Sequence, residues 1–136
     1  MSTTTGNMGA SRRTVSSGGP WEAAAGYSRA VVVGDACFVS GTTDAGPDGQ
    51  SRHPGDIAGQ AEALLAIIEN ALREGDFAIE QIVRTRMYVT DISRSGEVLE
   101  VHRRWFGDIR PAATMIQVAA LIDPSLLIEI EVEARR

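Results

Sequence analysis

The amino-acid sequence predicts an α+β domain in which a mixed β-sheet carries two helices on one face. Three observations support this fold class. Short runs rich in Val and Ile are bounded by turn residues, as strands are, and two longer segments repeat apolar residues at helical spacing. Their order is β-hairpin, helix, strand, helix, strand, strand, which is typical of an α+β sheet of four or five strands.

The first 19 residues are rich in Ser, Thr and Gly, which predicts a flexible tail, with residues 12–16 as a candidate edge strand. We expect residues 20–136 to form one domain. Two β-prone runs within residues 29–41 are separated by Gly34 and Asp35, a two-residue connection that predicts a hairpin. Glycine and proline then mark residues 42–55 as a surface loop.

The longer of the two predicted helices covers residues 56–74. Asp56 can cap its first turn and Gly75 can end it. Eighteen residues make a helix of about 27 Å, long enough to cross a sheet. The residues predicted to face the sheet follow one another at intervals of three or four: Ile57, Ala61, Leu64, Ile68 and Leu72.

The remaining elements are three strands and a less regular helix. The strands are predicted over residues 83–89, 114–120 and 126–134, and the helix over residues 95–106, ending at Gly107. Alternation in the first of these strands predicts that Val83 faces inward, together with residues 85, 87 and 89.

The second face of the sheet carries charge. Glu129, Glu131 and Glu133 alternate with apolar residues on the last strand, and Arg84 and Arg86 alternate in the same way on another. Three carboxylates on one face repel one another unless positively charged side chains pair with them, so these arginines are the expected partners. A face of mixed charged and apolar residues suits a subunit interface, and we therefore expect a homo-oligomer.

Composition limits the chemistry. All 13 basic residues are arginine, which excludes lysine Schiff bases, lysine-tethered pyridoxal phosphate and the P-loop. With 18 acidic residues the net charge is −5, so nucleic acid is a poor default partner. No apolar run reaches the roughly 20 residues of a membrane span, and no apolar signal segment is present, so we expect a cytoplasmic protein. Cys37 is the only cysteine, His53 has no second ligand at metal spacing, and we expect neither metal nor cofactor.

Five segments, in this order and spacing, resemble the RidA/YjgF family over about residues 20–134. The resemblance implies a chorismate-mutase-like fold and a homotrimer whose sheets form a central barrel. It also implies three clefts between subunits that bind a small molecule, and the hydrolysis of imines and enamines to 2-oxo acids and ammonia. The segments are Gly26-Tyr27-Ser28-Arg29-Ala30, Val33-Gly34-Asp35 with Phe38-Val39-Ser40-Gly41, Val89-Thr90-Asp91, Arg110-Pro111-Ala112 and Ile128-Glu129-Ile130-Glu131.

The resemblance assigns roles to cleft residues and also shows a departure. Glu129 matches the glutamate that positions the attacking water, and Tyr27 matches the cleft tyrosine. Ala113 stands where deaminase members have the arginine that grips the substrate carboxylate. The lost contact contains two charge-assisted hydrogen bonds, so carboxylate capture should weaken on the order of a hundredfold.

Three further positions complete the predicted binding region. Thr114 and Met115 follow the gripping position, and Met115 replaces a cysteine whose backbone N–H contacts the substrate. Leu99 stands where many members have asparagine. Arg86 could supply the missing positive charge if it pointed into the cleft, although the strand glutamates compete for it. For Cys37 and His102 the better interpretations are an inert buried thiol and a core or interface histidine.

The leading hypothesis is thus a RidA-like trimer that binds a small molecule and hydrolyses an imine or enamine, with Glu129 and Tyr27 as the catalytic residues. Its substrate need not be a 2-imino acid. The alternative is a non-catalytic ligand-binding or regulatory trimer, which Ala113 favours. Endoribonuclease activity is a third hypothesis, which the acidic composition disfavours.

Overall fold

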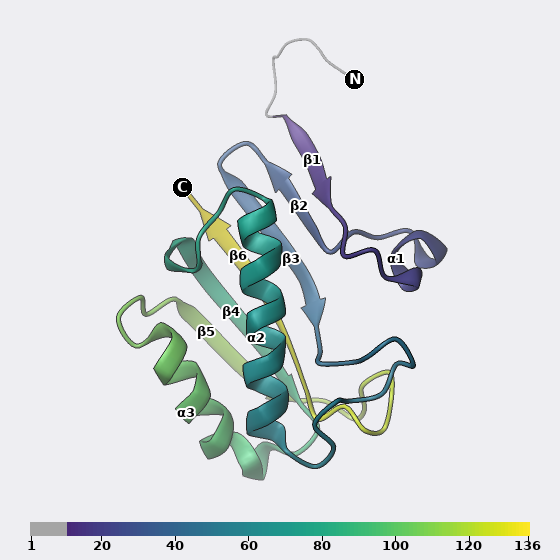
Figure 1. Cartoon of the computed structure of the whole chain (residues 1–136). Coiled ribbons are helices and arrows are strands. Elements are labelled where there is room, and N and C mark those ends of the chain that lie inside the picture. Colours follow the sequence, from purple (N-terminus) through teal and green to yellow (C-terminus); the bar gives the residue numbers. More distant parts are fainter. Residues whose placement is uncertain (1–10) are drawn as a thin grey trace.

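A computed structural model describes residues 11–136 as one six-stranded sheet with helices packed against it (Figure 1). Two short 3₁₀ turns, Ile79–Gln81 and Ile92–Arg94, precede β4 and α3. The other elements are, in chain order, β1 Arg12–Val15, α1 Pro20–Ala25, β2 Ala30–Val33, β3 Ala36–Thr42, α2 Ile57–Glu74, β4 Ile82–Val89, α3 Ser95–Phe106, β5 Ala112–Gln117 and β6 Ile128–Arg135.

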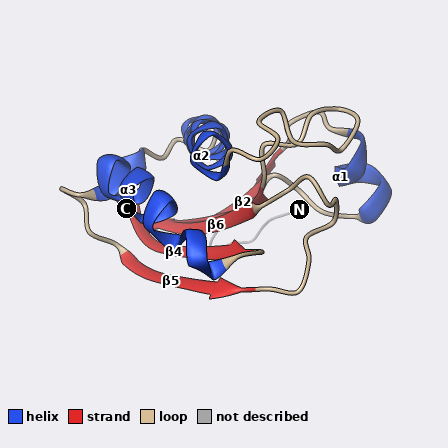
Figure 2. Cartoon of the chain, turned by 90° about the horizontal axis from the view of Figure 1, so that it is seen from below, coloured by secondary structure: helices blue, strands red, loops and turns tan. Residues whose placement is uncertain are grey.

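The strand order is β1-β2-β3-β6-β4-β5, and every neighbouring pair is antiparallel except β4 and β5. Helix α3 connects those two parallel strands. Figure 2 shows α2 and α3 on the same side of the sheet, which confirms the predicted α+β class and the placement of both helices on one face. The opposite face carries no helix among the described residues.

The N-terminal segment joins the sheet before residue 20, where the domain was predicted to begin. Residues 12–15 pair with β2 as the sixth strand, and Val15 is buried. The candidate edge strand is therefore confirmed, and the predicted tail is wrong for these four residues. The part of the tail formed by residues 1–10 lies outside the described residues.

The predicted hairpin and long helix are confirmed. β2 and β3 meet at Gly34, whose φ of 56° is the left-handed conformation that glycine adopts without strain. Asp56 caps α2, because its side chain accepts a hydrogen bond from the Gly59 N–H at 2.9 Å. All five residues predicted to face the sheet are buried: Ile57, Ala61, Leu64, Ile68 and Leu72.

Three predictions along the C-terminal half need correction. Val83 is exposed, because an irregular register between Ile82 and Arg84 inserts an extra residue into β4. β5 covers Ala112–Gln117 instead of the predicted residues 114–120, because its partner β4 ends at Val89, opposite Gln117. β6 begins at Ile128, two residues later than predicted. The predicted bounds of α3 are confirmed at both ends.

Helix α1 was not predicted, because six residues are too few for a periodic pattern. Its signals are nevertheless present in the sequence. Pro20 occupies the first turn, and Gly26 ends the helix with a φ of 80° while its N–H bonds to the Glu22 carbonyl. This helix sets the start of the connection that leads to Arg29 and β2.

The core between α2, α3 and the sheet is mainly aliphatic. Among the described residues only two aromatic side chains, Phe77 and Phe106, are buried. Gln60 is fully buried on α2, and its amide bonds to the backbone of His53, Ser125 and Leu127. These bonds hold the loop before α2 and the connection before β6 together, which fixes the point where β6 begins.

Candidate functional site

The helix-free face of the sheet carries the predicted charged residues of β4 and β6. The register places Arg84 opposite Glu133, Arg86 opposite Glu131, and Tyr88 opposite Glu129. The apolar residues between them point toward the helices, as the alternation predicts. We call this surface the open face.

The expected ion pairs form on the open face. Arg86 Nη1 lies 2.8 Å from Glu133 Oε2, and Arg84 Nε lies 4.0 Å from the same oxygen. The bond to Glu133 raises the pKa of Arg86. The Tyr88 hydroxyl donates to Glu131, which raises the pKa of that phenol. Arg86 is therefore held by Glu133 and is not brought to Glu129.

Glu129 is placed differently from its two neighbours on β6. Its carboxylate is half-buried against Gly41 of β3, and within residues 11–136 it has no hydrogen-bond partner. Burial raises the pKa of this carboxyl, the positive charge of Arg29 opposes that shift, and Glu131 adds to it. A carboxyl group with a raised pKa, free of partners, is suited to accept and return a proton.

Arg29 lies near Glu129, and the sequence analysis assigned it no role. Its backbone carbonyl accepts from the Ser40 N–H at 3.0 Å, and its Nη2 donates to the Gly41 carbonyl at 2.7 Å. The register of β3 shifts between Val39 and Thr42, which brings Gly41 next to Glu129. The available signal was its position two residues after Tyr27, within a segment already noted for the family resemblance.

Tyr27 lies on the short connection between α1 and β2. Its backbone N–H donates to the Glu22 carbonyl at the end of α1, and its ring is 43% exposed. The side chain is thus available at the surface, close in sequence to Arg29. The structure gives no direct contact between Tyr27 and Glu129.

The remaining predicted residues lie apart from Glu129. Ala113, Thr114 and Met115 are on β5, which β4 separates from β6, so Thr114 and Glu131 are two strand spacings or roughly 10 Å apart. Pairing with Arg86 puts Thr114 on the open face and its two neighbours on the other. Leu99 is 51% exposed on α3. Within one chain, the predicted binding residues therefore lie apart from Glu129.

The alternative candidates have structural roles. The His102 Nε2 lies 2.9 Å from the Thr85 hydroxyl, and burial lowers the pKa of this histidine. Cys37 is buried, and burial raises its thiol pKa. Both interpretations made from the sequence are confirmed. His53 is held by Asp44, whose buried carboxylate lies 3.0 Å from its Nδ1 and orders the loop before α2.

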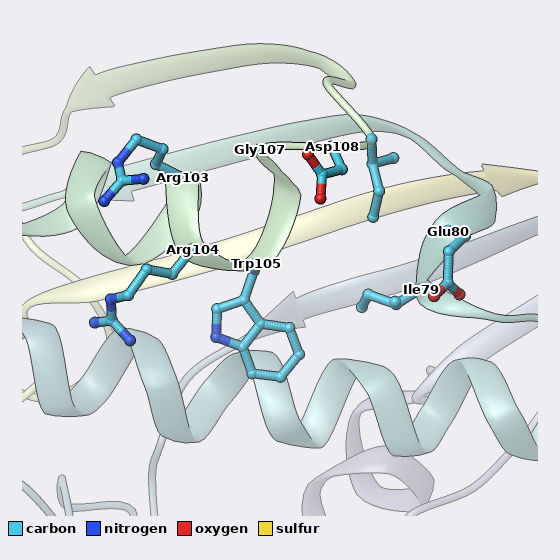
Figure 3. A pocket seen from close by; sticks show the side chains of 8 residues that line it. Ile79, Glu80, Arg103, Arg104, Trp105, Gly107 and Asp108 are labelled. Atoms are coloured by element: carbon cyan, nitrogen blue, oxygen red, sulfur yellow. The ribbon is translucent and has the colours of Figure 1, made fainter.

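A surface pocket of about 710 Å³ lies elsewhere, between the end of α3 and the 3₁₀ turn before β4. Figure 3 shows Arg104 and Trp105 extending from α3 toward α2. Both contact Glu62 on α2, and Arg103 pairs with Glu100 at 2.6 Å. Because its arginines are paired, this pocket offers no free cation to a ligand. Among residues 11–136 there is no cluster of potential metal ligands and no helix able to cross a membrane.

Comparisons with known proteins agree with this architecture. The family model described as Endoribonuclease L-PSP matches residues 19–136. A crystal structure of a Mycobacterium tuberculosis member of the YjgF/YER057c/UK114 family is 49% identical, with a TM-score of 0.84, covering 93% of this chain and 100% of that one. The chain belongs to the RidA/YjgF family.

Two curated RidA/YjgF relatives are similar over most of their length. An uncharacterised protein of Streptomyces coelicolor is 35% identical over 124 residues, which is 91% of this chain and 92% of that protein. The 2-iminobutanoate/2-iminopropanoate deaminase of Rattus norvegicus is 31% identical over 123 residues, which is 90% of this chain and 88% of the rat protein. The family resemblance expected from the five sequence segments is thereby confirmed.

Proposed function

We propose that this RidA/YjgF protein hydrolyses an imine or enamine of a small molecule in clefts between the subunits of a cytosolic homotrimer. The observation that carries the proposal is the state of Glu129. Its carboxyl group is half-buried, has a raised pKa, and has no hydrogen-bond partner within the described chain. The related rat protein, named as an imine deaminase, supports the choice of reaction.

The proposed chemistry needs one water molecule and one group that moves a proton. Glu129 accepts a proton from water as the oxygen attacks the carbon of the C=N bond. The same carboxyl then returns the proton to nitrogen, which gives a carbinolamine. It next takes the hydroxyl proton of the carbinolamine and passes it to the amino group, so that the C–N bond breaks, ammonia leaves and the C=O bond of the carbonyl product forms. Tyr27 contributes a hydroxyl that can hydrogen-bond to the substrate. An enamine enters this route after it gains a proton at carbon and loses one from nitrogen, which gives the imine.

The trimer is proposed from the open face and from the divided site. Phe38, Val83 and Ile116 are between 40% and 45% exposed, which is unusual for side chains on the body of a sheet. Covering them with a second copy removes apolar surface from water. The same contact would bring the edge strand β5 of one subunit, with Thr114 and Ile116 on its open face, toward Glu129 of another.

The test is release of ammonia from imines generated in situ by an amino-acid oxidase or by an amine oxidase, measured against buffer. We expect the wild-type trimer to accelerate release and Glu129→Gln to abolish the acceleration. Glu131→Gln is the matched control, because its side chain is committed to Tyr88 and its amide can still accept that bond. No acceleration by the folded trimer with either oxidase would refute the enzymatic proposal.

Ala113 favours a second candidate, a ligand-binding or regulatory trimer without catalysis, because the carboxylate grip of deaminase members is missing at this position. Binding of a small molecule without turnover would support it. Ribonuclease activity finds less support. Among residues 11–136, seven arginines form ion pairs with carboxylates and so present no basic patch to a phosphate backbone: Arg13, Arg73, Arg84, Arg86, Arg94, Arg103 and Arg104.

A further inference from the structure

The cations available near the candidate site are few. Arg84 and Arg86 share the carboxylate of Glu133 on the open face. Arg110 lies in the turn before β5, with a φ of 56°, and is therefore on the far side of β4 from Glu129. Of the arginines considered from the sequence, none stands beside Glu129 in the same chain.

Arg29 does lie near Glu129, and only part of the hydrogen-bonding capacity of its guanidinium is used. An arginine side chain has five N–H donors arranged in a planar fork. Nη2 donates to the Gly41 carbonyl at 2.7 Å, whereas Nε is buried with no acceptor within residues 11–136. In the same range, no carboxylate lies within ion-pair distance of Arg29. Nε is enclosed by the protein, so the donors open to a ligand are the terminal N–H groups that Gly41 does not use.

Gly41 links Arg29 to Glu129. Its carbonyl receives the arginine, and its Cα faces the glutamate so closely that an added Cβ would lie 2.1 Å from Glu129 Oε2. The cation and the carboxylate therefore lie against one backbone residue without pairing to each other. Each remains available to a ligand, and a molecule that met both would be held at two points.

We propose that Arg29 binds the carboxylate of the ligand and replaces, from the other side of the cleft, the grip that Ala113 cannot provide. The inference rests on the proposed function, because that function places the reacting C=N group of the ligand beside Glu129. The substrate class is then a small imine bearing a carboxylate close to its C=N carbon. A planar fork matches a carboxylate through two parallel N–H···O bonds, which a neutral amide cannot form equally well.

Binding is measured separately from turnover. The probes are 2-oxobutanoate, the product expected from hydrolysis of 2-iminobutanoate, and the neutral 2-oxobutanamide, each titrated into the wild-type trimer by calorimetry. Arg29→Gln keeps a donor for the Gly41 carbonyl and removes the charge. Arg110→Gln removes an exposed arginine on the β5 side and serves as the matched control. Arg29→Lys keeps the charge without the fork.

We expect Arg29→Gln to weaken 2-oxobutanoate binding by roughly ten- to a hundredfold and to leave 2-oxobutanamide binding within about twofold. Arg29→Lys should fall between wild type and Arg29→Gln, and Arg110→Gln should match wild type. Equal losses for both probes would indicate a structural role and overturn the inference, as would unchanged carboxylate binding in Arg29→Gln or no binding of 2-oxobutanoate by wild type. Carboxylate binding through Arg29 without imine turnover would uphold the inference and reject the proposed reaction.

Discussion

Replacing Gly41 with alanine should separate the activity of this protein from its stability. The glycine has no unusual backbone conformation, so alanine can adopt it. The added Cβ would lie 2.1 Å from Glu129 Oε2 and 3.0 Å from Cδ, and these are the atoms at the far end of a flexible side chain. Ordinary non-bonded contacts lie near 3.5 Å, so the carboxylate must retreat by roughly 1 Å or more.

The expected consequence differs for the two properties. A misplacement of about 1 Å in a reacting group can cost about a hundredfold in rate, so kcat for imine hydrolysis should fall by that order. The free energy of unfolding should change by less than about 1 kcal/mol, since only the end of one side chain has to move. Turnover is measured as ammonia release, and stability by urea denaturation.

Gly96→Ala provides the matched control. Gly96 lies in the first turn of α3, and an alanine Cβ there would meet no atom within 4 Å. This variant should keep full activity and be more stable by roughly 0.5–1 kcal/mol, because alanine is the better helix former. If Gly41→Ala turned over substrate at the wild-type rate, the position of the Glu129 carboxylate would not matter for the reaction and its assigned role would be wrong.

Three further predictions concern pH, the core and assembly. Because the folded-state pKa of Glu129 is raised above its ordinary value of 4.5, its ionisation costs stability as pH rises through that raised pKa. Glu129→Gln should therefore melt higher than wild type at pH 7 and equally at pH 4 in calorimetry, and a lower melting point at pH 7 would contradict this. Thr85→Val removes the partner of His102 Nε2 and should destabilise by about 1–3 kcal/mol in urea, whereas Thr85→Ser should retain most of the stability. Ile116→Arg on the open face should reduce the sedimenting species from a trimer to one 14.5 kDa chain, and an unchanged trimer would remove that face from the proposed interface.

Local patterns predicted the elements whose burial is regular. The apolar spacing in α2 follows the helix period because one face of the helix packs on the sheet along its whole length. The glutamates of β6 alternate with apolar residues because one face of this strand is buried under the helices along most of its length. Val83 broke the alternation because a bulge inserts one residue without any local signal. α1 was too short to show a period, although Pro20 and Gly26 mark its ends.

The candidate site was predictable only in part. Glu129 and Tyr27 are predicted from motifs whose residues lie close to them in sequence. Arg29 was missed because its relation to Glu129 is created by the pairing of β2 with β3 and of β3 with β6, which joins residues 100 positions apart. The surroundings of Glu129 depend on a bulge in β3, and no periodic pattern in the sequence reports it.

The two edges of the sheet are unlike, and this affects how the chain folds in crowded solution. β1 is four residues long and begins with two exposed arginines, which discourage another strand from pairing with it. β5 is longer, is largely exposed and contains no charged residue. Its unpaired backbone groups can template mispairing until something covers them, so aggregation during refolding should begin at β5. A charged residue introduced near Ile116 would then improve refolding yield at high concentration while it prevents assembly.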